Sequence, residues 1–409
     1  MPAIRRRPLL GALAAAAAAP RIAQAQAQAN ELRIGALFPF SGTLAQLGDE
    51  SFRGLELAVE DRNAAGGVAG RQLRLVRGDA ADQAQAVAES RRLMTTERVA
   101  AIFGTYASPP SFAATQVAEV QGIAYLELGA LSDSITERGL RGVFRTCPRA
   151  ADYGVVSVDA VQEVLAPAWG VDPRALRIVL LHEDGLDGQG VAAAQEAEFR
   201  RRGFAQVERI GYAARSAEFP PLVQRLRGAG TEVVLHAGRQ NDILLFFRGL
   251  EEAGWRPRMV VGAGGGYSLG DTARAIGPAF EGVMNVDVPQ FAISDTFAPG
   301  AAAFAEAYKR RFGADPRSGH SLSNFVGAQA CLEAMQRAGG AERDRLRTAL
   351  LATDIPEGGT ANGWGLRFDE RGQNTRARPL LMQWQGGRQV TIFPADAAVT
   401  SPRGRMGMG

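Results

Sequence analysis

Lysine is almost absent from this chain of 409 residues. Lysine and arginine together number 46, yet Lys309 is the only lysine, which excludes most covalent chemistry that depends on a lysine amine. The three histidines, His182, His236 and His320, stand at no metal-binding spacing from one another or from a cysteine. A glycine-rich phosphate-binding loop is missing as well. We therefore expect no cofactor and no metal.

Cysteine is also scarce, with only Cys147 and Cys331 in the whole chain. A disulfide framework in a small exported protein needs several cysteines at short spacings. Two cysteines so far apart do not form such a framework. We expect two unpaired, buried thiols.

The chain has one markedly apolar stretch near its N-terminus and no other long enough to cross a membrane. Arg5–Arg7 precede a short apolar run, Leu9–Ala19, and repeated Ala-Gln-Ala offers a cleavage site. This pattern predicts that residues 1–27 are a signal peptide, and the paired arginines are also typical of twin-arginine export. No cysteine lies near the cleavage site, which argues against a lipid anchor. We expect a soluble periplasmic protein that begins between Gln26 and Asn30.

An excess of basic charge is missing once this segment is removed. The whole chain has a formal charge of +3, and residues 1–27 contain four arginines and no acid, so the remainder carries −1. The basic pI is thus no argument for nucleic acid as a partner.

Alternating strand and helix patterns fill most of the chain. A first run of alternation extends from Leu32 to about Thr146, and a second extends from about residue 151 to Val261. Each run has the pattern of a parallel sheet with crossover helices. We predict an α/β protein of two doubly wound, Rossmann-like lobes.

The segment that follows the apolar run Val99–Phe103 is a candidate ligand site. Tyr106 and Ser108 lie in its loop, and a helix begins at about Ser111. Ligands of open α/β sheets bind where strands end, and a helix N-terminus suits an anion. Ser108 either contributes to such a site or only caps the helix.

Two other motifs are weaker. Gly266–Gly270 matches the Gly-x-Ser-x-Gly pattern of serine hydrolases, with Ser268 as nucleophile and His320 downstream. Three glycines and an alanine separate this motif from the preceding strand, whereas a nucleophile needs the sharp turn directly after it. Gly262-Ala263-Gly264 lacks the third glycine of a dinucleotide fingerprint.

One family resemblance covers nearly the whole chain, from about Leu32 to about Phe393. The sequence resembles the leucine/isoleucine/valine-binding family of periplasmic solute-binding proteins. The resemblance is carried by Ile34–Gly42, Gly48, Gly54–Val68, Gly70–Leu73, Asp79, Gly104 with Ser108, and Phe144–Thr146.

The resemblance implies a type I periplasmic-binding fold, in which three crossovers form a hinge between two lobes. We place the crossovers near Pro148, Pro289 and Pro379. The expected division is 31–148 plus 290–378 for lobe one, 149–289 plus 379–395 for lobe two, and 396–409 as a disordered tail.

The resemblance also assigns site positions. In amino-acid-binding members a serine holds the ligand carboxylate, and Ser108 matches it. Gly129 and Leu131 fall at the second carboxylate position, where a hydroxyl residue is usual. Leu47 stands where an aromatic often lines the side-chain pocket.

The groups that bind the ligand ammonium in those members do not match. The expected acid is replaced by Gly264 and the expected tyrosine by Arg239, while Asp187 replaces a further aromatic. A guanidinium attracts a carboxylate and repels an ammonium, which favours an organic acid without an α-amino group. Alternatively, Asp187 restores ammonium binding, or Arg239 pairs with Asp242 or Asp187 outside the cleft. The rival ligand is then an ordinary branched-chain amino acid.

The resemblance implies a binding protein and not an enzyme. We expect a monomer that captures a small solute and delivers it to the permease of an ABC importer in the inner membrane. Two alternatives are a ligand-sensing receptor module for a signalling partner and an exported hydrolase that uses Ser268.

Overall fold

The computed structural model describes residues 31–213 and 219–407. The predicted signal peptide, residues 1–27, lies outside the described residues. Among them, no helix is long and apolar enough to cross a membrane.

Lobe one is built on a five-stranded parallel sheet with the order β2-β1-β3-β4-β5. Its strands are β1 (Glu31–Phe38), β2 (Gln72–Asp79), β3 (Ala101–Gly104), β4 (Ala124–Glu127) and β5 (Val143–Arg145). The connecting elements are η1 (Gly42–Leu44), α2 (Ala45–Ala64), α3 (Gln83–Thr95), α4 (Ser108–Val120) and α5 (Ser134–Glu137).

Both faces of this sheet are covered because its strands are apolar on both sides. Ile34 and Phe38 of β1 face a cluster that includes residues of α2, whereas Leu37 faces a cluster with residues of α3 and α4. The first face is completed by a segment from much later in the chain. That segment contains α13 (His320–Ala338), α14 (Arg343–Leu351), β11 (Asp354–Ile355) and β12 (Leu366–Arg367).

Lobe two is built on a seven-stranded sheet with the order β14-β13-β10-β9-β8-β6-β7. Its strands are β6 (Ile178–Glu183), β7 (Val207–Tyr212), β8 (Val233–Ala237), β9 (Met259–Ala263), β10 (Met284–Asp287), β13 (Leu380–Gln385) and β14 (Arg388–Phe393). β13 and β14 pair antiparallel, and the other strands are parallel.

Helices cover both faces of the second sheet too, and residues of α6 and α8 pack on one face while α9 and α10 pack on the other. The predicted helix 151–165 continues through a π-helical turn to residue 169. The helices are α6 (Ala150–Asp159), η2 (Ala160–Leu165), α7 (Ala166–Trp169), η3 (Pro173–Ala175), α8 (Leu186–Arg201), α9 (Phe219–Gly228), α10 (Gln240–Glu252), η4 (Gly265–Tyr267), α11 (Gly270–Ile276) and η5 (Gly277–Phe280).

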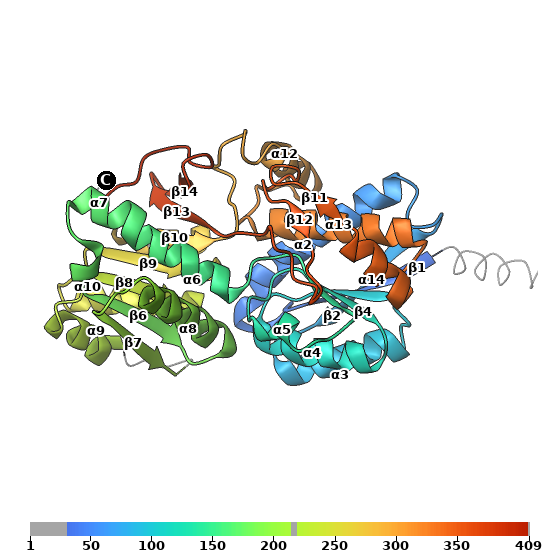
Figure 1. The fold of residues 1–409 in the computed structure, drawn as a ribbon, viewed down its shortest axis with the longest axis horizontal. Helices are drawn as coiled ribbons and strands as arrows, with labels where there is room; N and C mark the ends of the chain where they lie inside the picture. Colours follow the sequence, from blue (N-terminus) through green and yellow to red (C-terminus); the bar gives the residue numbers. More distant parts are fainter. Residues whose placement is uncertain (1–30, 214–218, 408–409) are drawn as a thin grey trace, which may run out of the picture.

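The chain passes between the lobes three times (Figure 1). It leaves lobe one after β5, returns after β10 by way of α12 (Ala301–Phe312), and leaves again to form β13. This architecture confirms the predicted fold: two lobes of α/β structure with parallel sheets, joined by three crossovers.

The expectation of a disordered tail is wrong for residues 396–407, which pack on lobe two. The indole Nε1 of Trp169 donates a hydrogen bond to the carbonyl of Gly404 at 2.5 Å. Gln383 exchanges two hydrogen bonds of 2.8 Å with the backbone of Arg403. The tail lacks a helix or strand pattern of its own, so these contacts leave no local sequence signal.

Candidate functional site

A cavity of about 90 Å³ lies between the two lobes. Its walls are formed by residues that follow the carboxyl ends of strands in both sheets, as expected for open α/β sheets. The beginnings of α2 and α13 complete the wall of lobe one. Seven of the eight predicted site residues line this cavity: Leu47, Tyr106, Gly129, Leu131, Asp187, Arg239 and Gly264.

Ser108 is the exception, because its fully buried side chain is used within the protein. Its Oγ accepts a hydrogen bond from the N–H of Ser132 at 3.0 Å. Its own N–H donates to both carboxylate oxygens of Asp187, at 3.1 and 3.2 Å. Ser108 is also the first residue of α4, and the N-cap position is occupied by Ala107. The helix-cap interpretation of Ser108 is therefore wrong.

The buried carboxylate of Glu127, at the end of β4, positions the loops of lobe one that reach the cavity. It accepts hydrogen bonds from the N–H groups of Thr105, Gly129 and Ala130, each at 2.8 Å. A buried charge is tolerated when hydrogen-bond donors surround it. Glu127 thereby ties the loop after β3 to the loop after β4.

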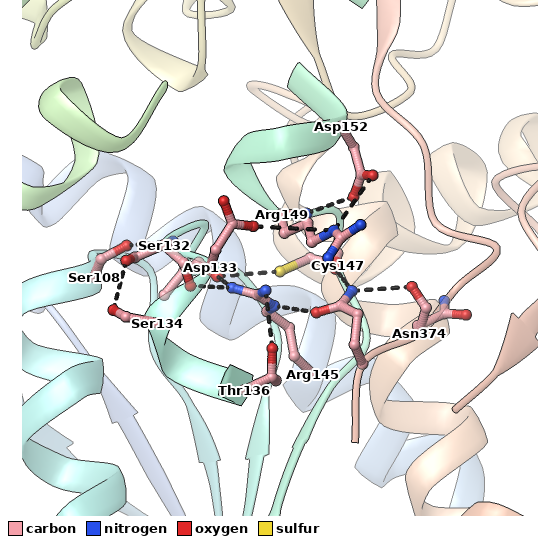
Figure 2. Close-up of polar contacts among 12 residues, drawn as sticks. Ser108, Ser132, Asp133, Ser134, Thr136, Arg145, Cys147, Arg149, Asp152 and Asn374 are labelled. Carbon is pink, nitrogen blue, oxygen red and sulfur yellow. Dashed lines mark hydrogen bonds and ion pairs between the residues drawn. The ribbon is translucent and has the colours of Figure 1, made fainter. Parts of the chain in front are cut away.

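Arg145 supports the lobe-one wall of the cavity by binding the loop that follows β4 (Figure 2). Its fully buried guanidinium donates to the carbonyls of Ala130 and Ser132, at 3.2 and 2.6 Å, and to Gln373 Oε1 at 2.6 Å. Burial lowers the pKa of Arg145. The arginine holds residues 130–132 in place, and this loop presents the N–H of Ser132 to Ser108.

The wall of lobe two contains three carboxylates, and each of them accepts hydrogen bonds from the protein. Glu183 Oε2 accepts from the N–H of Gly185 at 2.9 Å. Asp187 accepts from Ser108. Burial, the largest influence, raises the pKa of Asp187 to about 6, against the hydrogen bonds from Ser108.

Asp287, which ends β10, is the third carboxylate and is fully buried. It accepts hydrogen bonds from the Tyr153 hydroxyl at 3.0 Å, the Ser268 hydroxyl at 2.5 Å and the N–H of Val288 at 2.8 Å. His320 Nε2 lies 3.6 Å from its Oδ1.

Arg239 supplies the positive charge of the lobe-two wall. Its N–H donates to Asp242 Oδ2 at 3.0 Å and so anchors the start of α10. Arg239 lines the cavity, and in the part of the chain that the structure describes its guanidinium forms no ion pair and no hydrogen bond with another residue. Asp242 is thus bound by the backbone of Arg239 and not by its side chain.

Gly265 lets the lobes approach each other, and its neighbour Gly264 has a backbone conformation that favours glycine. Gly264 has φ +97°, a conformation that strains other residues, and its position is open. A Cβ on Gly265 would lie 2.4 Å from Tyr106 Oη and 2.9 Å from His320 Cε1, both in lobe one. Lobe two therefore contacts lobe one through bare backbone here.

The geometry does not form a serine nucleophile at Ser268. Its hydroxyl donates to Asp287 and accepts from Asn285 Nδ2 at 2.9 Å, whereas a serine nucleophile needs a histidine base at this distance. His320 lies instead beside Asp287, with its Nδ1 3.1 Å from Ser318 Oγ. The turn η4 also separates Ser268 from β9.

Several residues of the cavity were not predicted from the sequence. Asp287 occupies the last position of a strand, and that place was the only available signal. Ser323 and Asn324 come from α13, far along the chain, and carried no signal. Both are buried, and among the described residues Ser323 Oγ and Asn324 Oδ1 have no hydrogen-bond partner. The expectation of two unbonded cysteines is confirmed, and Cys147 lines the cavity.

Two α/β lobes that close on a cavity at their strand ends define a type I solute-binding protein, and comparison with known proteins agrees. A periplasmic binding protein family model matches residues 31–389, so this chain belongs to the periplasmic binding protein family. The Leu/Ile/Val-binding protein homolog 7 of Brucella suis biovar 1 is 45% identical over 392 residues, which is 96% of this chain and 98% of that protein.

Solved structures share the fold. The leucine-binding protein LivK of Thermotoga maritima has a TM-score of 0.77 at 20% identity, covering 88% of this chain and 97% of that one. A benzoate-bound solute-binding protein of R. palustris has a TM-score of 0.74 at 22% identity, covering 92% and 99%.

Proposed function

We propose that this chain is the substrate-binding component of an ABC importer, exported to the periplasm by residues 1–27. In this role it captures a small carboxylate-bearing solute and delivers it to a membrane permease. Membership of the periplasmic binding protein family and a cavity of solute size between two lobes support this role. The crossovers near Pro148, Pro289 and Pro379 act as the hinge, with the lobe boundaries given above.

Arg239 carries the proposal about the ligand. Its guanidinium lines the cavity without an ion pair among the described residues, whereas Glu183, Asp187 and Asp287 all accept hydrogen bonds from protein donors. Arg239 is partly buried, and a solute carboxylate can pair with its guanidinium through two parallel hydrogen bonds.

The proposed ligand lacks an α-ammonium. The family position of the ammonium-binding acid is Gly264, where no side chain is present. Aromatic or branched organic acids satisfy both conditions. The R. palustris protein, which is bound to benzoate, has the same fold, but its low identity to this chain carries no argument about the ligand.

A second candidate is a branched-chain amino acid in a rearranged clamp, with its carboxylate on Arg239 and its ammonium on Asp287. The observation in its favour is that Asp287 lines the cavity and is fully buried. Its oxygens already accept from Tyr153, Ser268 and Val288, which leaves little capacity for an ammonium.

Titration calorimetry of the mature protein decides between the two candidates. Leucine, isoleucine and valine are compared with their 2-oxo counterparts and with benzoate. The organic acids should bind and the amino acids should not. Micromolar binding of leucine with no response to any acid would contradict the proposed ligand class and favour the second candidate.

Delivery to a permease is tested separately. Deletion of the gene in the native host should abolish uptake of the radiolabelled ligand, and the mature sequence with its own signal peptide should restore uptake. Normal uptake, together with loss of a transcriptional response to the ligand, would instead identify a sensor.

A further inference from the structure

The contact between Ser108 and Asp187 joins the two lobes beside the cavity, which Asp187 lines. We use the term Ser108 clamp for the N–H and hydroxyl of Ser108, at the start of α4 in lobe one. Asp187 is the second residue of α8 in lobe two. The N–H lies 3.1 and 3.2 Å from the two carboxylate oxygens, and hydrogen bonds from both parts of the clamp lower the pKa of Asp187 against the effect of burial.

The sequence of α4 leaves no other donor at this helix end. Pro109 and Pro110 have no N–H, and the N–H of Ser111 donates to the carbonyl of Ala107 at 3.2 Å. The N–H of Ser132 is bonded to Ser108 Oγ. The Ser108 clamp is therefore the whole anion-binding capacity of this turn, and Asp187 occupies it.

The charges around Asp187 do not provide another role for its carboxylate. Glu183, on β6 of the same lobe, repels it, and Arg239 attracts it, yet no ion pair forms between Asp187 and Arg239 among the described residues. The atoms within hydrogen-bond distance of Asp187 belong to Ser108 of the opposite lobe.

We infer that Asp187 is a specificity-determining residue, which fills the Ser108 clamp when the lobes close and so excludes a solute carboxylate from it. The inference rests on the proposed function. The inference deepens the proposed function by assigning the solute carboxylate to Arg239 of lobe two alone. Lobe one then contacts the uncharged part of the solute.

The test uses the mature protein with four variants: Asp187→Ala, Asp187→Asn, Ser108→Ala, and Asp187→Ala combined with Ser108→Ala. Calorimetric titration with isovalerate and benzoate measures affinity, and thermal unfolding checks that each variant is folded. Asp187→Ala vacates the clamp. Asp187→Asn removes the same charge but retains an amide oxygen that accepts the N–H of Ser108, so it is the matched control for charge alone.

Asp187→Ala should bind isovalerate about tenfold to a hundredfold more tightly than Asp187→Asn does, the range for a hydrogen bond to a charged group. The double variant should lose part of this gain because the hydroxyl of the clamp is missing. Equal gains in Asp187→Ala and Asp187→Asn would mean that only charge matters and would overturn the inference.

The remaining outcomes separate this inference from the proposed function. If the wild type binds the acids and Asp187→Ala binds them no more tightly, the inference is overturned and the proposed function stands. Binding by Asp187→Ala alone supports the inference and contradicts the proposed ligand class. Wild-type binding that is lost on Ser108→Ala would show that the solute displaces Asp187, which also overturns the inference.

Discussion

The two walls of the cavity differ in how they treat charge. Lobe one contributes Leu47, Tyr106 and Leu131, and its buried ions, Glu127 and Arg145, are used to hold loops. Lobe two brings Arg239 and three carboxylates to the cavity itself. In lobe one these charges hold loops behind the wall. In lobe two the carboxylates line the cavity but accept hydrogen bonds from the protein, whereas Arg239 forms no ion pair among the described residues. The proposed ligand class therefore assigns recognition of the charged group to lobe two and selection for size and shape to lobe one.

The largest expected effect comes from preventing the two walls from meeting. Gly265→Ala places a Cβ 2.4 Å from Tyr106 Oη, and overpacking of this kind costs about 1–3 kcal/mol. Affinity for the ligand should fall by about fivefold to more than a hundredfold. Calorimetry measures this change, and Tyr106→Phe in the same chain should restore part of the affinity.

Gly228→Ala is the control for this comparison, because a Cβ there meets nothing within 4 Å. It should bind like the wild type. Unchanged affinity in Gly265→Ala would mean that the lobes do not close through this contact.

Removal of the charge from the lobe-two wall should have the next largest effect. Arg239→Gln should weaken binding of an organic acid about tenfold to a hundredfold, because a charge-assisted hydrogen bond is lost. The affinity of Arg239→Lys should fall between those of the wild type and Arg239→Gln, because lysine retains the charge but lacks the planar fork of the guanidinium. Arg248→Gln, an exposed arginine of α10, is the matched control. Equal behaviour of the two glutamine variants would refute Arg239 as the anchor.

The polar atoms of the lobe-one wall should contribute less. Ser323→Ala removes a buried hydroxyl, whereas Asn324→Ala removes a buried Oδ1 together with the hydrogen bond from Nδ2 to the carbonyl of His320 at 2.8 Å. Ser323 Oγ and Asn324 Oδ1 have no partner among the described residues, and a neutral hydrogen bond is worth about 0.5–1.5 kcal/mol. Each should therefore weaken binding of a solute that bears a hydroxyl only about twofold to tenfold. Ser90→Ala, whose buried Oγ is also unpartnered but lies in α3, should change nothing.

The smallest effect concerns pH and the contact between the walls. Since burial raises the pKa of Asp187 from 3.8 to about 6, the folded state favours the neutral acid. The contribution of protonated Asp187 to the free energy of unfolding is present in full below about pH 4, and it is lost as the pH rises to about 6. The melting temperature of Asp187→Asn relative to the wild type should rise over this range, by about 1–3 °C, and then remain constant. A constant difference from pH 4 to 7 would contradict the raised pKa.

Local patterns were sufficient to predict most of the fold. The apolar runs that end at Phe38 and Phe103 became strands of one sheet, and the later alternation became a second sheet. Seven of the eight predicted site residues line one cavity because the carboxyl ends of parallel strands meet at one edge. The tail was misjudged because its order depends on contacts with Trp169 and Gln383 and not on its own composition.

By itself, the sequence determined the two-lobed α/β class and the loops that reach the cleft, since periodicity and glycine placement act over short distances. Only the tertiary structure decided how each charge is used. Ser108 and Asp187 are 79 residues apart along the chain, and nothing local indicates that one binds the other. Asp287 and Asn324 likewise reach the cavity only through the packing of β10 and α13. A hydrogen-bond partner is a property of three-dimensional proximity, so the chemistry of the site depends on how the lobes close.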